Sequence, residues 1–185
     1  ISNYKDILYV NRGKKLGRGS AVLEGIKRVI DIDDLEIIIE IDTDLAHDPN
    51  EIPENIKKFS ENNLDLLISS RYVTGSKILN WSLNRRIFSI LANFLTKILL
   101  GVPISDYTNG FRIYSKTAAR HIIQNCGSIG DGFIILSEIL VELYYNGYKI
   151  DETKTIWKNR VSGKSTVGFN EIFEAFIGVL KIYRK

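Results

Sequence analysis

The chain has 185 residues, of which 44% are hydrophobic, and it carries a formal net charge of +3 with a pI near 8.9. This length and composition suit one domain with an ordinary hydrophobic core and exclude a second large domain. The mild basic bias suits phosphate-bearing small molecules or an anionic membrane surface, and the lack of a basic stripe interleaved with aromatic residues argues against nucleic acid as a partner.

Strand and helix patterns alternate over the first 69 residues. Residues 7–10 have a strand pattern, residues 20–30 a helical pattern and residues 35–41 a second strand pattern, which together predict a right-handed βαβ unit. A short helix over residues 52–61 and a strand over residues 64–69 continue the alternation. This order predicts an α/β fold with a mostly parallel sheet flanked by helices.

Helical patterns are longer in the second half of the chain. Residues 83–100 have so broad an apolar face that it must be buried or touch lipid, and we expect it to pack in the core. A further helix is predicted over residues 137–146, an extended segment over residues 148–157 and an amphipathic helix over residues 170–183. This last helix has a basic end, so it suits either packing against the sheet, which we favour, or a membrane interface.

Two carboxylates follow the most apolar strand pattern. The run over residues 37–41 has the composition of a buried strand, and Asp42 and Asp44 come directly after it. Because residues i and i+2 of a strand point the same way, both carboxylates can hold one hard divalent cation. Open α/β sheets bind ligands beyond such strand ends, although Asp is also common wherever a strand gives way to a loop. His47 is near enough to be a third ligand, but an oxygen-preferring site favours a supporting role in the loop.

Two segments imitate phosphate-binding motifs without completing them. Gly163-Lys164-Ser165 matches the end of a Walker motif, but Lys158 occupies the position where that motif needs Gly. Gly17-Arg18-Gly19 follows a strand pattern, but Val22 occupies the position where the dinucleotide fingerprint needs Gly or Ala. The second segment remains a basic, glycine-rich turn that suits either a pyrophosphate or a plain strand-to-helix connection.

Further polar and basic motifs follow in a fixed order, which carries more weight than any one of them. Several guanidinium groups together with a divalent cation suit two phosphate groups at once. The motifs are residues 15–21, 41–47, 70–72, 93–96, 105–108 and 111–114, Trp81 with Arg85, Arg86 and Ser89, and Arg160 with residues 163–165. Along nearly the whole chain they resemble the catalytic domain of dolichyl-phosphate mannosyltransferases and their polyprenyl-phosphate relatives, within family 2 of the inverting glycosyltransferases.

The resemblance implies a GT-A fold with a nucleotide-sugar site. Asp42 and Asp44 are then the residues that hold Mg²⁺ or Mn²⁺ against the diphosphate of the donor, and Asp44 is taken as catalytic. Arg160, Lys164 and Ser165 match the late basic loop that closes over the donor phosphates.

The resemblance also implies a site for the phosphate of a lipid acceptor. Arg71, Arg85 and Ser89 fall at the intervals at which the family places the residues that grip this phosphate. Asp106 and Arg112 match the motif that lines the reaction centre, and both are taken as catalytic.

The implied reaction transfers mannose from GDP-mannose to dolichyl or polyprenyl phosphate with inversion at the anomeric carbon. Because a phosphate monoester is largely ionised at pH 7, the acceptor supplies its own nucleophile and needs no protein base. A lipid acceptor places the protein at the cytoplasmic face of a membrane. No run approaches the roughly 18 apolar residues of a membrane span, so we expect contact through the membrane surface, a small membrane subunit or segments outside this chain.

Departures from the family pattern leave alternatives open. The opening strand and the Asp-Asp-Gly-Ser-like turn that bind base and ribose are missing, and the chain starts at Ile1 without any Met. We therefore expect residues 1–185 to be a single catalytic domain truncated at its N-terminus. Arg18 stands where the family often has Leu, and Ala46 where some members place another metal-contacting side chain. The alternatives are a transferase that uses a UDP-sugar and a non-catalytic remnant that binds phosphate ligands.

Overall fold

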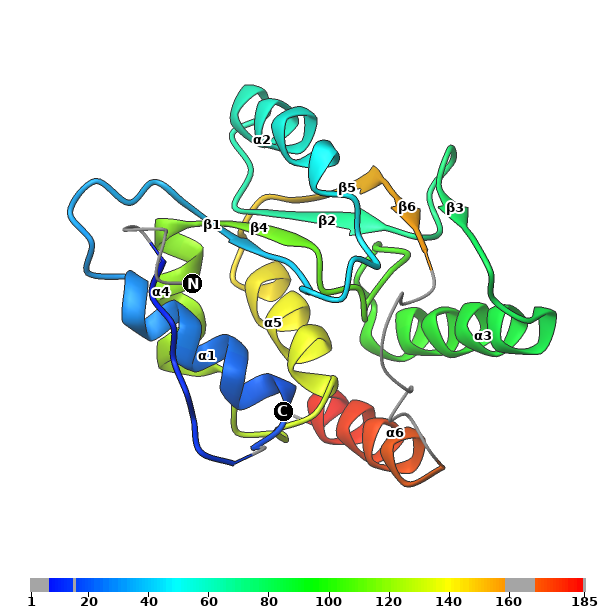
Figure 1. The fold of residues 1–185 in the computed structure, drawn as a ribbon. Helices are drawn as coiled ribbons and strands as arrows, with labels where there is room; N and C mark the ends of the chain where they lie inside the picture. Colours follow the sequence, from blue (N-terminus) through cyan, green and yellow to red (C-terminus); the bar gives the residue numbers. More distant parts are fainter. Residues whose placement is uncertain (1–6, 15, 159–168, 185) are drawn as a thin grey trace.

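The computed structural model describes residues 7–14, 16–158 and 169–184 of the chain. A four-stranded sheet lies at its centre with helices on both faces (Figure 1). Its strand order is β1-β4-β2-β5, with β1 at Ile37–Glu40, β4 at Arg112–Ser115, β2 at Leu66–Ser70 and β5 at Ile150–Lys154. A second, two-stranded sheet pairs β3 (Lys77–Ile78) in parallel with β6 (Ile156–Trp157).

Strand β4 runs against its neighbours. It pairs antiparallel with both β1 and β2, whereas β2 and β5 pair in parallel. Strands β1, β2 and β5 therefore share one direction, and the α/β class with helices flanking the sheet is confirmed. The expectation of mostly parallel pairing is wrong at both contacts of β4, because a four-residue strand between a polar loop and a helix has too short a pattern to be recognised.

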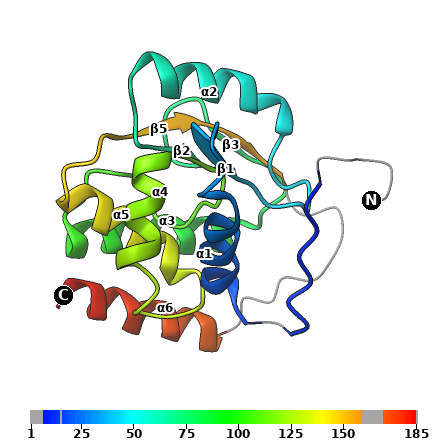
Figure 2. The same ribbon diagram turned by 90° about the vertical axis from the view of Figure 1, so that its left-hand side faces the viewer.

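Within the described residues, six α-helices and one 3-10 turn surround the sheet. Helix α2 covers one face, and α1, α4 and α5 cover the other (Figures 1 and 2). The predicted helices over residues 52–61 and 83–100 are confirmed to the residue. The bounds are Arg18–Val29 for α1, Pro49–Glu51 for the 3-10 turn, Ile52–Glu61 for α2, Leu83–Leu100 for α3, Lys116–Asn125 for α4, Ile134–Tyr145 for α5 and Phe169–Tyr183 for α6.

Strand β2 separates two hydrophobic cores. All five of its residues are buried. Leu66 and Ile68 face the larger core, to which α1, α4, α5 and α6 contribute, while Leu67 faces a smaller core with Phe59 of α2 and Ile113 of β4. Because successive side chains of a strand point to opposite faces, β2 packs into both cores. This packing fixes the position of the two ends of the strand.

The predicted strand over residues 7–10 does not form, so the βαβ unit is absent. Ile7, Leu8 and Tyr9 are 53%, 68% and 66% exposed. This segment runs alongside α1, away from the sheet (Figure 2). A β pattern becomes a strand only where a neighbouring strand accepts its backbone hydrogen bonds. The sequence patterns also failed to predict β3 and β4.

Helix α3 forms as predicted, but its expected core packing is wrong. Only Asn93 and Leu100 of this helix are buried, and α3 projects from one side of the fold (Figure 1). Helix α6 packs mainly on α3 and α5 rather than on the sheet, which corrects the second packing prediction. None of the helices in the described ranges has the length and apolarity of a membrane span. The apolar side chains of α3 that are 44–70% exposed are Leu83, Ile87, Phe88, Ile90, Leu91, Phe94, Leu95 and Ile98.

Candidate active site

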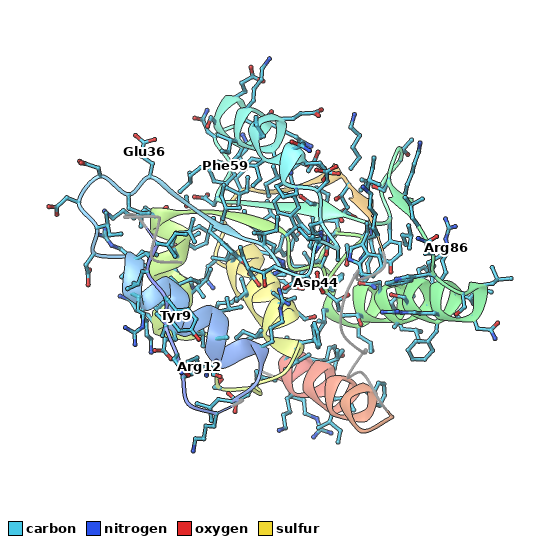
Figure 3. The ribbon with its side chains drawn as sticks, viewed as in Figure 1. Tyr9, Arg12, Glu36, Asp44, Phe59 and Arg86 are labelled. Atoms are coloured by element: carbon cyan, nitrogen blue, oxygen red, sulfur yellow. The ribbon has the colours of Figure 1, made fainter. Side chains whose placement is uncertain are left out.

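Polar residues gather beyond the ends of β1 and β2. The two strands share one direction and end at Glu40 and Ser70, so the loops that follow them leave the same edge of the sheet. Because β4 runs the opposite way, the loop that precedes Arg112 lies at this edge as well. Figure 3 shows Asp44 in this region, on the side of the sheet where α3 lies. The edge therefore collects loops from three separate parts of the chain.

Arg18, at the start of α1, binds the acidic end of β1. Its Nη1 donates to Asp42 Oδ1 at 2.7 Å, and its Nη2 donates to Glu40 Oε1 at 2.8 Å. The Tyr114 hydroxyl donates to the other oxygen of Glu40 at 2.7 Å. Glu40 and Asp42 thus share one cation at i, i+2 spacing, which is the arrangement predicted for Asp42 and Asp44.

Asp44 lies in a turn beyond the strand. Its Oδ1 accepts a hydrogen bond from the Ala46 N–H at 3.0 Å, and Leu45 adopts a left-handed φ of 60°. Carboxylate oxygens of Asp42 and Asp44 are the ligands that Mg²⁺ and Mn²⁺ prefer, so the donor set fits the predicted cation. Among the described residues no group of three or more His, Cys, Asp or Glu side chains is placed to hold a metal. A cation would therefore take its other ligands from water or a bound diphosphate.

His47 is the buried neighbour of these carboxylates. Its side chain is 1% exposed, and its Nε2 lies 3.9 Å from Asp42 Oδ2, which is too far for a hydrogen bond. Neither ring nitrogen has a hydrogen-bond partner in the described part of the chain, and the ring edge contacts Phe111 at a centroid distance of 5.5 Å. Burial lowers the pKa of His47 and outweighs the opposite effect of Asp42, so the ring is neutral at pH 7. His47 thus lies beside Asp42 without a hydrogen bond to it, and its supporting role stays a prediction.

Arg71 and Asp106 form a buried ion pair at the same sheet edge. Nε and Nη2 of Arg71 donate to the two carboxylate oxygens at 2.8 and 2.7 Å, and the Arg71 backbone N–H donates at 3.0 Å. Burial acts to raise the pKa of Asp106, but the charge and hydrogen bonds of Arg71 outweigh it and hold this pKa below its ordinary value. Both groups are charged at pH 7, so the charge of Arg71 already has a partner within the protein.

Backbone N–H groups complete the surroundings of this ion pair. The Asp106 Oδ1 accepts from the N–H groups of Thr108 and Asn109 at 3.2 and 3.0 Å. Glu152 of β5 accepts in turn from the N–H groups of Ser105 and Asp106 at 2.8 and 3.0 Å. The backbone of the loop that carries Asp106 is therefore held by two carboxylates, that of Asp106 itself and that of Glu152.

Arg112 has a different place from the one predicted. It is fully buried, and its guanidinium donates to the backbone carbonyls of Asn109, Leu136 and Tyr107 at 2.8, 2.7 and 2.9 Å. These contacts tie the loop before β4 to α5. The prediction that Arg112 lines the reaction centre gives way to a positioning role, because its donors point into the protein.

Arg85 and Ser89 meet Arg71 around two aromatic side chains. The guanidinium carbons of Arg85 and Arg71 lie 4.3 and 5.6 Å from the Trp81 ring centroid. The Ser89 hydroxyl lies 2.6 Å from the Tyr72 hydroxyl, and the guanidinium carbon of Arg71 lies 5.3 Å from the Tyr72 ring centroid. The structure thus brings together the three residues predicted to bind the acceptor phosphate.

Three predicted donor-site residues, Arg160, Lys164 and Ser165, lie outside the described residues. The last described residue before them is Lys158, whose backbone N–H donates to the Ala46 carbonyl at 2.9 Å. The chain therefore enters this basic segment directly beside the loop that follows β1.

Sequence reasoning missed Glu40, Tyr114 and Trp157 as parts of this region. Glu40 carried a usable signal, because it is the one charged residue in an otherwise apolar strand. Tyr114 stands in the motif of residues 111–114 but was given no role, and Trp157 carried no signal, since its partner Trp81 lies far away in the sequence. Trp157 meets Trp81 edge to face at a centroid distance of 4.9 Å and so extends the aromatic side of the site.

Comparisons with known proteins identify the family of the chain. The model of the family described as glycosyl transferase family 2 matches residues 1–123. The chain is 27% identical over 173 residues to an undecaprenyl-phosphate mannosyltransferase of Micrococcus luteus, which covers 93% of this chain and 69% of that protein. It is 29% identical over 174 residues to a polyprenol monophosphomannose synthase of Mycolicibacterium smegmatis, which covers 92% of this chain and 63% of that protein. These matches confirm the predicted resemblance.

Solved structures share the fold at low sequence identity. Three crystal structures of glucosyl-3-phosphoglycerate synthase from Mycobacterium tuberculosis give TM-scores of 0.59, 0.57 and 0.60 at 14%, 12% and 13% identity. The matched regions cover 97%, 92% and 92% of this chain. They cover 58%, 56% and 56% of the three solved chains. The second contains UDP and the third phosphoglyceric acid. At this identity the likeness concerns the fold alone, and it confirms the predicted GT-A class.

Replacing Asp106 by Asn should lower the free energy of unfolding by roughly 3–5 kcal/mol at pH 7, because it leaves the buried charge of Arg71 without its partner. The folded-state pKa of Asp106 lies below the ordinary value of 3.8. The contribution of the ion pair is therefore fully present above that ordinary value and is lost as the pH falls through the lower, folded-state value. Urea unfolding of Asp106→Asn and the parent at pH 7 and in acid measures this difference.

The matched control is Asp31→Asn, which changes an exposed carboxylate after α1. This variant should shift the free energy of unfolding by less than about 0.5 kcal/mol. Equal stabilities of Asp106→Asn and Asp31→Asn at pH 7 would contradict the role given to the ion pair. A difference between Asp106→Asn and the parent that does not shrink in acid would contradict it as well.

Proposed function

Because the chain belongs to glycosyl transferase family 2, we propose that it transfers mannose from GDP-mannose to a polyprenyl or dolichyl phosphate with inversion at the anomeric carbon. The observation that carries this proposal is the similarity over 93% and 92% of the chain to two relatives whose names specify mannose and a polyprenyl acceptor. The cluster of Arg71, Arg85 and Ser89 supports it, because it lies beside an exposed apolar helix where a lipid phosphate needs both a charged and an apolar surface.

The acidic side of the site is proposed to bind the donor. Asp42 and Asp44 would hold a divalent cation, either Mg²⁺ or Mn²⁺, whose charge offsets the negative charge that grows on the leaving diphosphate. The basic segment with Arg160, Lys164 and Ser165 follows Lys158, which contacts the same loop. We propose that its positive side chains bind the donor phosphates from the other side.

The basic side of the site is proposed to bind the acceptor phosphate. Arg71 shares its charge with Asp106, and Arg85, whose guanidinium stacks on Trp81, adds positive charge for a dianionic phosphate. Ser89 donates from the next turn of α3. The acceptor oxygen then attacks the anomeric carbon directly, because an ionised phosphate needs no general base.

A pocket beside this cluster suits the apolar part of the acceptor. It has a volume of about 180 Å³ and is lined by Tyr72, Ile90, Asn93, Phe94, Lys97 and Ser105. Tyr72 also contacts Ser89, so the pocket begins where the proposed phosphate site ends. We place the first prenyl units here.

Helix α3 is the proposed contact with the membrane. Its exposed apolar residues cover most of its length, and it carries Arg85, Arg86 and Lys97 without any acidic residue. Such a combination suits the interface of an anionic bilayer. The protein would then be a peripheral membrane protein at the face where the acceptor phosphate is exposed.

The reaction itself is tested by incubating the purified protein with undecaprenyl phosphate and radiolabelled GDP-mannose, with Mn²⁺ or with EDTA. We expect a labelled lipid product only with the metal. Asp44→Asn should reduce the rate at least about 100-fold, because the cation loses one of its two carboxylate ligands.

A parallel reaction with UDP-glucose distinguishes the donor. Product from UDP-glucose and none from GDP-mannose would show that the donor assignment is wrong and the acceptor class right. Product from neither donor, from a folded protein, would favour the non-catalytic alternative. Unchanged rates in Asp44→Asn would remove Asp44 from the proposed metal site.

Arg85→Ala should raise the KM for undecaprenyl phosphate by about 10- to 100-fold and leave the KM for the donor unchanged, because a charged hydrogen bond to phosphate is worth about 1.5–3 kcal/mol. Steady-state kinetics with each substrate varied in turn measures both constants. Arg28→Ala, which removes an exposed cation from α1, is the control and should leave both constants unchanged. An equal rise in the KM for the donor would contradict the assignment of Arg85 to the acceptor.

The double variant Leu91→Asp, Phe94→Asp should bind vesicles of phosphatidylglycerol and phosphatidylcholine at least about tenfold more weakly than the parent, because each buried apolar side chain contributes about 1.5 kcal/mol or more. Co-sedimentation with vesicles measures the binding. Ile32→Asp, at a 53% exposed apolar residue outside α3, should bind like the parent. If the double variant also binds like the parent, α3 is not the membrane contact.

A further inference from the structure

Arg18 occupies the place from which a cation would reach Asp42. Its two salt bridges, to Asp42 at 2.7 Å and to Glu40 at 2.8 Å, use both terminal nitrogens of the guanidinium. The side chain is only 17% exposed. Because Asp42 Oδ1 already accepts from Arg18, only Oδ2 faces the neighbouring turn and His47.

The surrounding backbone is shaped around this guanidinium. A Cβ atom at Gly110 would collide with Arg18 Nη2, so a side chain at this position would displace the guanidinium. The Phe133 ring lies 5.4 Å from the guanidinium carbon. The start of α1 is itself fixed, because the Gly19 N–H donates to the Asp131 carbonyl at 2.7 Å. Arg18 is thus a built-in part of the acidic site.

A divalent cation on Asp42 has to share this carboxylate with a fixed positive charge. Two positive groups on one carboxylate repel each other, and partial burial strengthens the repulsion because water screens it less. Arg18 has a second partner in Glu40, which the Tyr114 hydroxyl holds in place. The Arg18 guanidinium therefore stays in the site, held by Glu40, when Asp42 binds a divalent cation.

We propose that Arg18 is an internal counter-ion of Asp42 that competes with the divalent cation and keeps cation binding weak until an anionic nucleoside diphosphate is also bound. This inference rests on the proposed metal site of Asp42 and Asp44. The diphosphate adds negative charge between the two cations and so removes their repulsion. Cation and diphosphate consequently bind with positive coupling, each raising the affinity for the other by the same factor.

This coupling keeps the divalent cation from occupying the site when no donor is bound. Without a donor, Asp42 has Arg18 as its counter-ion. With a donor, the diphosphate adds negative charge that Arg18 and the cation can share. Arg18 thereby sets the order of events: the metal enters with its nucleotide rather than before it.

The test is Mn²⁺ binding to the purified protein, measured by electron paramagnetic resonance with and without GDP. In the parent, GDP should tighten Mn²⁺ binding strongly. In Arg18→Leu, Mn²⁺ alone should bind at least about tenfold more tightly than to the parent, since a nearby positive charge is gone, and the added effect of GDP should be smaller. Arg28→Leu, which removes an exposed cation from the same helix, should bind Mn²⁺ like the parent.

A second variant guards against misfolding, because Arg18→Leu leaves two neighbouring carboxylates without their cation. Gly110→Ala keeps every charge but displaces the Arg18 guanidinium from its slot, so it should also tighten Mn²⁺ binding without GDP. Unchanged or weaker Mn²⁺ binding in both variants, with normal binding in the parent, overturns the inference about Arg18 alone. Absence of Mn²⁺ binding in the parent and in every variant, with and without GDP, overturns the proposed metal site together with the inference.

Discussion

The ion pair between Arg71 and Asp106 is the constraint on which the rest of the site depends. Neither charge can stay buried alone, and the Asp106 carboxylate is satisfied only when Arg71 after β2 and the loop before β4 meet at one sheet edge. Glu152 holds the backbone of that loop, and the three carbonyl contacts of Arg112 tie its far end to α5. A fold that satisfies these groups therefore also fixes the position of Tyr72 and Trp81.

Charge is divided unequally across this edge. Glu40, Asp42 and Asp44 lie on the side of β1, while Arg71 and Arg85 lie on the side of β2 and α3. His47, neutral because it is buried, stands between the two sides with Phe111. The proposed reaction has to bring two anions together, a nucleotide sugar and a phosphate. A carboxylate side that holds a cation and a separate guanidinium side would keep their negative charges apart until they react.

The sequence predicted those parts of the fold whose cause is local. Helix α3 has a periodic pattern, Ser82 as its N-cap and Gly101 in the left-handed conformation at its C-cap, so its bounds follow from neighbouring residues. Strand β4 and the contact of Arg18 with Asp42 have causes that lie far away in the chain, and short patterns do not record them. The spacing of Arg71, Arg85 and Ser89 identified side chains that converge, whereas the same argument misplaced Arg112. A motif gives the identity of a residue and its neighbourhood, but only the packing around Asn109 and α5 shows that this guanidinium points inward.

Helix α3 shows how folding and function separate in one element. The larger core is formed mainly by β2, α1, α4, α5 and α6 and the smaller one by β2, β4 and α2, and α3 contributes to the larger core through Leu99 and Leu100 at its end. Asn93 supplies its other anchor, since its side-chain oxygen accepts from the Tyr107 N–H at 2.8 Å. Most of the other apolar residues of α3 remain 44–70% exposed, although α6 packs on this helix, and large exposed apolar patches mark surfaces that contact other molecules. These side chains can therefore still be buried against another molecule. They lie on the helix that also carries Arg85 and Ser89. A lipid whose phosphate is held by these two residues has its apolar chain beside the same helix, so one element can recognise both halves of an amphipathic acceptor.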